Sequence, residues 1–527
     1  MEFTVELPNP KSNKSICASF FGVCPEKDSN DKELIQAIEY CKQNDISTLY
    51  FEKGIYHFKN KSFITFAEMS DFTFDGQNSE FIFHEPEMFL IENSQRVLFK
   101  NCIMDIDWDT MRYATVVRII ENDTQSSVMT VEFLNNDSED TDFIVNSFNQ
   151  FDPKYMTPGA PDGKEIWVYP DSLPKRIYKG NHIFELHYTQ EDMKPIKKDE
   201  IYLLRNMTLR SGCVIHINNC THITVKDNTI YGSRGMTHMV SGQSHHIRFD
   251  GEKICVRPNS NRYISTDGDG IHIIQSNGYI IIENCDFSAM GDDDVNIHDC
   301  HFFVDKKLDE KSILFKNEAY GQKGDIIKIH RCDFSPLSEK LTIDKIEPLE
   351  NHRTIVYFNE KIPEEIKEGY MLVNKSFGSN YYIIRNNYFH ENRARGLLLQ
   401  CSNGLVENNR FYRTEGAAIF IMLEALVGLW YEGSGVDGLV IRNNTFTDVN
   451  CGDWTSCLDM ISNIPDKTSD YAPFRNIEIY NNTFKNCSDP VMILEHGSNI
   501  TVKDNFIDSG VTEKTFKISK CENINVN

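Results

Sequence analysis

Two acidic clusters in the middle of the chain contain the residues best suited to chemistry. The first is Ser265–His272 (STDGDGIH) and the second is Met290–His298 (MGDDDVNIH). Carboxylates that lie close together repel, which raises the pKa of at least one of them. One protonated and one ionised carboxyl group form the pair that cleaves a glycosidic bond. The two clusters therefore predict an acid/base site.

Simpler roles for these aspartates are a calcium site or the capping of turns in a solvated coil. Asp269 and Asp293 are 24 residues apart, and His272 and His298 flank the clusters. This pairing favours a functional site over isolated turns, because perturbed carboxylates gather at functional sites.

Three later segments offer candidate substrate-binding groups. Arg393 and Arg395 can bind sugar hydroxyls or hold a carboxylate, Glu415 is a further acid, and Trp430 lies in a Gly-rich stretch where it can stack on a sugar. The alternatives are ion pairs between neighbouring segments for the charged residues and core packing for the tryptophan.

A repeated phrase surrounds these residues and predicts how they are positioned. Apolar residues alternate with polar ones and end in Asn-Asn, Asp-Asn or Asn-Cys, as at Asn386-Asn387, Asn408-Asn409 and Asn481-Asn482. Asn387 and Asn409 are 22 residues apart, about one coil of a solenoid. Asn tolerates the left-handed conformation of a sharp turn, and its amide can bond from coil to coil. Because Ile, Val and Asn recur where a leucine-rich repeat carries Leu, the pattern predicts an all-β fold, a parallel β-helix.

The period also predicts a register and a division of the chain. Ile271 and Ile273 should lie over Val295 and Ile297, with coils ~4.8 Å apart, so that both acidic clusters form one patch. Residues 1–109 are assigned to an N-terminal cap and the first coils, the cap being a helix that starts with Asp31 as its N-cap. Residues 206–300 and 379–527 are assigned to further coils. Residues 110–205 and 301–378 lack the repeat and are assigned to two inserted β-rich domains, barrel-like in form.

The amino-acid composition limits the classes of molecule that this protein can bind. The 527 residues carry 54 basic and 78 acidic side chains, a net charge of −24, which disfavours nucleic acid or an anionic membrane as partner. No apolar run is long enough for a transmembrane helix. The 15 cysteines include no C-x2-C pair, which argues against a zinc finger. Together with the absence of a secretory signal in this numbering, these thiols predict a cytoplasmic protein. No metal and no cofactor are expected, and a homodimer is compatible with the sequence.

The segment Gly291–His298 (GDDDVNIH) resembles the GDD-x-VNIH signature of glycoside hydrolase family 110. The resemblance continues through Asp269–His272, Arg393–Leu398, Glu415–Ile419 and Trp430–Gly433, and covers the chain from about Phe72 onward. It implies a right-handed parallel β-helix and an inverting α-galactosidase that removes terminal α-1,3-linked galactose, including from blood-group-B-like glycans.

The resemblance also implies the roles of individual residues. It makes Asp269, Asp292 and Asp293 the catalytic residues without settling which is acid and which is base. Asp294 stands where a small residue is expected, and we include it with His272, His298, Arg393, Arg395, Glu415 and Trp430 as substrate-binding residues. An inverting site needs two working carboxyl groups ~6.5–9.5 Å apart, which Asp269 and the Asp292/Asp293 pair can reach across one coil.

Three other functions fit the same fold. A polygalacturonase-type hydrolase uses a similar aspartate patch and needs basic residues for the uronate carboxylate. A calcium-dependent polysaccharide lyase uses aspartates as metal ligands and is sensitive to chelators. A non-catalytic carbohydrate-binding β-helix would retain affinity without turnover.

Overall fold

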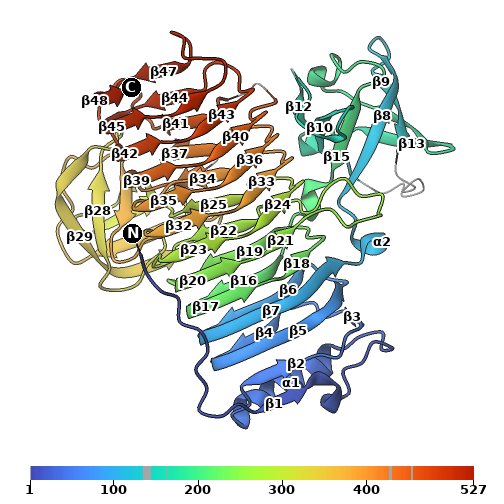
Figure 1. Cartoon of the computed structure of the whole chain (residues 1–527). Coiled ribbons are helices and arrows are strands. Elements are labelled where there is room, and N and C mark those ends of the chain that lie inside the picture. Colours follow the sequence, from blue (N-terminus) through green and yellow to red (C-terminus); the bar gives the residue numbers. More distant parts are fainter. Residues whose placement is uncertain (1, 135–143, 162, 427–429, 453–454) are drawn as a thin grey trace.

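The computed structural model describes residues 2–134, 144–161, 163–426, 430–452 and 455–527, and its main body is a parallel β-helix. Figure 1 shows the strands stacked as successive coils, from the N-terminal coils at one end to the C-terminal coils at the other. Two long parallel sheets run along this stack, and two inserts project from it on opposite sides. The predicted fold class is confirmed.

The larger sheet has 22 strands. They are β1 (Ser15–Cys17), β2 (Thr48–Tyr50), β3 (Ile55–Phe58), β5 (Ser70–Phe83), β7 (Gln95–Ile106), β17 (Thr221–Lys226), β18 (Thr229–Ile230), β20 (His245–Asp250), β21 (Lys253–Ile254), β23 (Ile280–Glu283), β24 (Asp286–Ser288), β32 (Tyr382–Arg385), β33 (Tyr388–His390), β35 (Gly404–Glu407), β36 (Arg410–Tyr412), β39 (Val436–Arg442), β40 (Thr445–Thr447), β42 (Phe474–Tyr480), β43 (Thr483–Lys485), β45 (Gly497–Lys503), β46 (Phe506–Ile507) and β48 (Glu522–Val526).

The second sheet has 12 strands and carries the acidic clusters at the start of two of them. Its strands are β4 (Ile64–Ala67), β6 (Glu87–Glu92), β16 (Cys213–Asn218), β19 (Met236–Ser241), β22 (Ile271–Ile274), β25 (Val295–His298), β34 (Leu397–Leu399), β37 (Ile419–Leu426), β38 (Trp430–Glu432), β41 (Leu458–Asn463), β44 (Met492–Glu495) and β47 (Phe516–Ser519). Strand β38 alone is antiparallel to its neighbour, β37.

The register between the two acidic coils is the one that the sequence predicts. In β22 and β25, Ile271 pairs with Val295, His272 with Asn296, and Ile273 with Ile297. The isoleucines and the valine are fully buried in the core of the solenoid. Their burial fixes the register, because a slip of one residue would turn every apolar side chain of the strand outward.

An asparagine ladder joins the C-terminal coils. The first residue of each pair, such as Asn386 or Asn408, has a positive φ of 58°. The side chain of the second residue bonds to the next coil: the amides of Asn387 donate to the Oδ1 of Asn409, and those of Asn409 donate to the Oδ1 of Asn444. Each buried amide is thereby satisfied, which is why Asn recurs at this turn.

Helix α1 (Asp31–Gln43) packs at the N-terminal end of the stack, as Figure 1 shows. The predicted N-cap is wrong by one residue: Asn30 occupies the cap position, and Asp31 instead accepts the backbone N–H groups of Lys59 and Asn60. The other helices are short: α2 (Trp108–Met111), η1 (Ala18–Phe21), η2 (Pro170–Ser172), η3 (Glu191–Met193) and η4 (Met207–Leu209).

The two inserts have separate hydrophobic cores. The first is an eight-stranded sheet whose described strands pair without closing: β8 (Ala114–Asp123), β9 (Val128–Phe133), β10 (Ser147–Asp152), β11 (Thr157–Pro158), β12 (Glu165–Trp167), β13 (Lys175–Gly180), β14 (Ile183–His187) and β15 (Ile201–Arg205). The second is a closed barrel of β26 (Phe302–Lys307), β27 (Ser312–Phe315), β28 (Ile326–His330), β29 (Pro336–Pro348), β30 (Thr354–Phe358) and β31 (Met371–Asn374).

All 15 cysteines are free thiols, and eight of them are buried. None of the helices in the described part of the chain is long and apolar enough to cross a membrane.

Candidate active site

A cavity of about 770 Å³ opens at the starts of the strands of the 12-stranded sheet. Its floor comes from the loops that precede β22, β25 and β34, one wall from β12 of the first insert, and the opposite wall from the β37–β38 hairpin. The cavity therefore lies where three separate parts of the chain meet.

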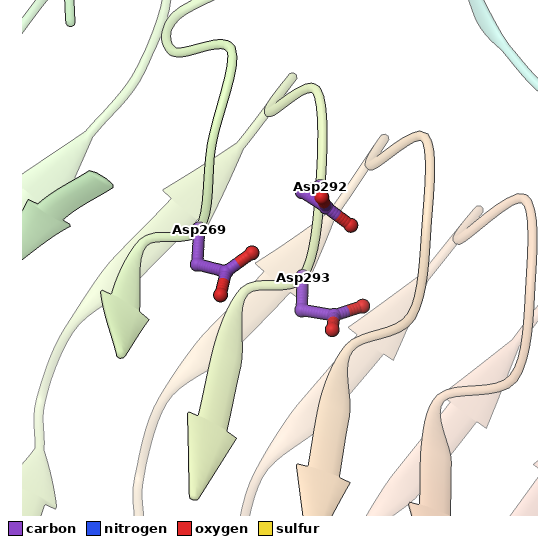
Figure 2. Close-up of side chains that lie close together, drawn as sticks. All are labelled: Asp269, Asp292 and Asp293. Atoms are coloured by element: carbon purple, nitrogen blue, oxygen red, sulfur yellow. The ribbon is translucent and has the colours of Figure 1, made fainter. Parts of the chain in front are cut away.

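Asp269, Asp292 and Asp293 lie together on the floor of this cavity. One carboxylate oxygen from each residue lies within 4.8 Å of the other two. Figure 2 shows Asp269 on one coil, with its carboxylate toward the next coil, which carries Asp292 and Asp293. The predicted acidic patch is therefore present; the 4.8 Å limit joins the nearest oxygens, whereas the ~6.5–9.5 Å of an inverting site is the separation of the two carboxyl groups.

Each carboxylate has a cationic or imidazole partner. Arg395 donates two hydrogen bonds to Asp293, of 2.7 and 2.8 Å. Arg210 lies 2.7 Å from Asp292 and 3.8 Å from Asp269. These guanidinium groups stabilise negative charge in the cavity, and charge-assisted pairs of this kind hold the carboxylates in fixed orientations.

The surroundings separate the two neighbouring aspartates electrostatically. Burial alone would raise the pKa of Asp292, but Arg210, Arg393 and Arg395 together hold it well below its usual range. Burial raises the pKa of Asp293, and the charges on Asp292 and Asp269 raise it further against the opposing effect of Arg395. One site therefore contains an ionised carboxylate beside a carboxyl group that holds its proton more tightly, which is the division of labour that acid/base catalysis uses.

A histidine pair continues from Asp269 along the outer face of the 12-stranded sheet. Nδ1 of His272 lies 2.6 Å from a carboxylate oxygen of Asp269, and its Nε2 lies 3.0 Å from Nε2 of His298. Burial lowers the pKa of His298, whereas for His272 the bond and charge of Asp269 outweigh burial and raise the pKa. The pair orients Asp269.

Two tryptophans stand on the walls of the cavity. Trp430 on β38 is 56% exposed and Trp167 on β12 is 43% exposed, and both line the cavity. Arg393 lies over the ring of Trp167, with its guanidinium carbon 5.4 Å from the ring centroid, and pairs with Glu165 of the same strand. An exposed ring held in this way is a preformed surface on which a sugar can stack.

Four predicted substrate-binding residues line the cavity: His272, Arg393, Arg395 and Trp430. Three others lie behind its wall. Asp294 is fully buried, and neither carboxyl oxygen has a hydrogen-bond partner among the described residues. His298 and Glu415 are also buried and do not line the cavity. For these three, direct contact with the substrate stays a prediction, since their side chains are buried in this structure.

Sequence reasoning missed Arg210, Glu165 and Trp167. Arg210 lies in the link between the first insert and β16, and the other two lie on β12, all outside the repeat that located the aspartates. The signal available was the insert itself, since inserts on a solenoid often form a wall of its binding face.

The three carboxylates also have the spacing of a cation site. A divalent cation there would have to displace or sit beside the guanidinium groups of Arg210 and Arg395, which lie 2.7 Å from Asp292 and Asp293. The residues present fit an acid/base role better than a calcium site.

Comparison with known proteins identifies relatives of this chain in sequence and in structure. The chain is 25% identical to α-1,3-galactosidase B of Bacteroides thetaiotaomicron over 97% of this chain and 88% of the relative. It is 23% identical to α-1,3-galactosidase A of Shewanella woodyi over 94% of this chain and 86% of the relative. Residues 351–507 match the family model described as a right-handed beta helix region. A solved A-module of a mannuronan C-5 epimerase from Azotobacter vinelandii aligns with a TM-score of 0.47 and 10% identity over 97% of this chain and 99% of that chain. The resemblance to the α-1,3-galactosidases is confirmed.

Proposed function

We propose that this protein is an exo-acting glycoside hydrolase that removes terminal α-1,3-linked galactose with inversion of the anomeric centre. The observation that carries the proposal is the cluster of Asp269, Asp292 and Asp293 in a cavity lined by exposed aromatic rings. The relatives named α-1,3-galactosidases support the choice of galactose and of the linkage. Linear Galα1-3Gal and blood-group-B-like glycans are the proposed substrates.

The opposite pKa shifts indicate which aspartate carries out each of the two proton transfers of hydrolysis. Asp293, with its raised pKa, gives its proton to the glycosidic oxygen as the bond to the anomeric carbon breaks. Asp292, with its lowered pKa, takes a proton from the water that attacks that carbon. Asp269, oriented by His272, faces the positive charge that develops on the sugar ring.

The rival polygalacturonase-type function needs a free cation for the uronate carboxylate. Arg395 is committed to Asp293, Arg393 to Glu165, and Arg210 to Asp292. A neutral hexose that bonds through its hydroxyl groups suits such a cavity better than a uronate.

The experiment that tests the proposal follows the released sugar by proton NMR. The protein is incubated with p-nitrophenyl α-galactoside and with Galα1-3Gal in the presence of EDTA. We expect β-galactose to appear before the α anomer, since inversion places water on the opposite face from the leaving group. First appearance of α-galactose would contradict inversion, a requirement for calcium would favour a lyase, and binding without release would favour a non-catalytic protein.

A further inference from the structure

A second cavity, of about 650 Å³, lies at the other end of the strands that carry the proposed active site. It is formed between β28 of the barrel and the turns that lead into β32, β35, β39 and β42. Strand β34 relates the two cavities: Arg395, before it, lines the first, whereas Ser402 and Asn403, after it, line the second. The seven residue-to-residue steps from Arg395 to Ser402 can span at most about 25 Å.

The second cavity is cationic in a protein whose net charge is −24. Lys328, Lys375 and Arg475 line it, and Asp437 is the only acid among its described lining residues. Asp437 is engaged by the side-chain amide of Asn476 at 2.6 Å. No ion pair of the three cations with an acid is present in the described part of the chain. This leaves positive charge available to a ligand.

The strand register concentrates that charge. Lys328 pairs with Val373 across β28 and β31, so Lys375 is its diagonal neighbour on the same face. Lys340 pairs directly opposite Lys328 on the other side. Desolvation lowers the pKa of Lys375, and the charge on Lys328 lowers it further. Like charges placed together in this way are destabilising unless an anion joins them.

A neutral histidine lies in the wall of the same cavity. His330 is 4% exposed and lines the cavity; its Nδ1 donates to the carbonyl of Phe334 at 2.8 Å. Its Nε2 has no hydrogen-bond partner within the described residues. Burial lowers the pKa of His330 to about 3, so Nε2 keeps a lone pair at neutral pH. Nε2 is closed off from solvent, so His330 keeps this wall of the cavity uncharged without itself contacting a ligand.

Aromatic and amide groups complete the lining. Tyr381 is 40% exposed and stacks on Tyr279, with ring centroids 5.0 Å apart. Arg475 is held over Tyr471 at 5.0 Å and donates from Nε to the carbonyl of Ala472. Exposed rings beside fixed polar groups suit the two sides of a sugar, one apolar and one hydroxylated.

We propose that this second cavity binds a sugar that carries an anionic group, a carboxylate or a sulfate. The anionic group pairs with Lys328 and Lys375, and the sugar ring lies against the exposed ring of Tyr381. The site is separate from the proposed active site and holds an acidic sugar unit without cleaving it. It does not depend on the proposed hydrolysis.

Isothermal titration calorimetry of the full chain tests this site with four probes: methyl β-galactoside 6-sulfate, methyl β-galacturonide, neutral methyl β-galactoside and inorganic sulfate. We expect at least one of the charged sugars to bind about tenfold or more tightly than the neutral sugar and the sulfate ion. Whichever of the two binds identifies the anionic group. Equal binding of the neutral sugar would overturn the anionic part of the proposal, and equal binding of sulfate would overturn the sugar part.

Variants locate the binding. The double variant Lys328→Gln/Lys375→Gln should weaken binding of the charged sugar about tenfold or more, because both charged partners are lost. Tyr381→Ala removes the exposed ring, so it should weaken binding of the charged sugar and leave sulfate binding unchanged. The matched control is Lys361→Gln, an exposed lysine of the same barrel that pairs with Glu310 at 2.8 Å. Affinity that survives the double variant, or falls equally in the control, would overturn the site.

Discussion

Asp292 and Asp293 are adjacent in sequence, yet their environments push their proton affinities in opposite directions. The difference comes from what surrounds each carboxyl group: three arginines outweigh burial and lower the pKa of Asp292, whereas burial and the charges on Asp292 and Asp269 raise the pKa of Asp293. Residues up to about 100 positions away in the chain therefore set the pKa values that make one aspartate the proton donor and the other the proton acceptor.

This assignment predicts different leaving-group behaviour for two isosteric variants. Asp293→Asn should lower kcat/KM for Galα1-3Gal by about 10²- to 10⁴-fold, with a much smaller loss for p-nitrophenyl α-galactoside, whose leaving group needs little protonation. Asp292→Asn should lower both rates, because water activation is needed for either substrate. Steady-state kinetics on both substrates measures this.

Asp294→Asn is the matched control, since its side chain lies behind the cavity wall and burial raises its pKa well above the usual range. It should leave both rates close to wild type. A large and equal loss of kcat/KM for both substrates in Asp293→Asn would contradict the assignment of Asp293 as the proton donor.

Glu415 predicts a pH-dependent stability. Burial raises its pKa to about 8 in the folded chain, against an ordinary value of 4.5. Between these values the folded state binds more protons than the unfolded state, so the contribution of Glu415 to stability is full below about 4.5 and is lost as pH rises through about 8. Glu415→Gln, which cannot ionise, should become progressively more stable relative to wild type from pH 5 to pH 8. Urea unfolding at several pH values checks this, and a difference that stays constant with pH would contradict it.

At the scale of the elements, the repeat explains what the sequence could and could not predict. Ile271 and Ile273 revealed the register because burial penalises every alternative. The burial of Asp294 could not be predicted, because alternation starts only at Val295 and the turn before it follows no period. Trp167 and Glu165 were missed because β12 belongs to an insert without the repeat, and long-range docking against Arg393 leaves no local pattern.

The asparagine ladder should be a large contributor to stability. Asn444→Ala removes an Oδ1 that accepts from the backbone and side chain of Asn409, and an Nδ2 that donates to Val406 and Asn482. Leaving these buried groups unpaired should cost on the order of 2–4 kcal/mol of unfolding free energy. Asn443→Gly, at an exposed position with a φ of 57°, should change stability by only a few tenths of a kcal/mol. Equal effects of the two variants would contradict the ladder's role.

The first insert should contribute to substrate affinity through Trp167. Trp167→Ala should raise KM for Galα1-3Gal about three- to tenfold, as expected for the loss of one stacking surface, and change kcat less. Trp167→Phe should recover most of the affinity. Tyr169→Ala is the control, because Tyr169 is 70% exposed and does not line the cavity. A KM that is unchanged in Trp167→Ala would exclude stacking on this ring.

At the scale of the whole molecule, the two inserts differ in how they are tied to the solenoid. The first is anchored at the site: Arg205 of β15 is fully buried, donates to Asp267 at 3.0 Å and to the carbonyl of Gly291 at 2.9 Å. The second begins and ends at one point, since the backbone N–H of Ser379 donates to Asp299 at 3.0 Å. Among the described residues, the first insert supplies part of the cavity lining and bonds to the loops of its floor, whereas no lining residue comes from the second insert.

This asymmetry predicts the result of removing the barrel. Replacing residues 302–374 by a short Gly-Ser linker bridges ends that already meet, and none of the residues that line the proposed active site lies in that range. The shortened chain should keep the β-sheet circular dichroism and hydrolyse p-nitrophenyl α-galactoside within a few fold of wild type. It should unfold at a lower urea concentration, because Phe334, Met371 and Val373 of the barrel pack into the main core. It should also lose the acidic-sugar site, to which β28 contributes Lys328 and His330. A folded product without hydrolysis would show that the barrel supports catalysis through contacts beyond the cavity lining, and would contradict the independence inferred from the joined ends.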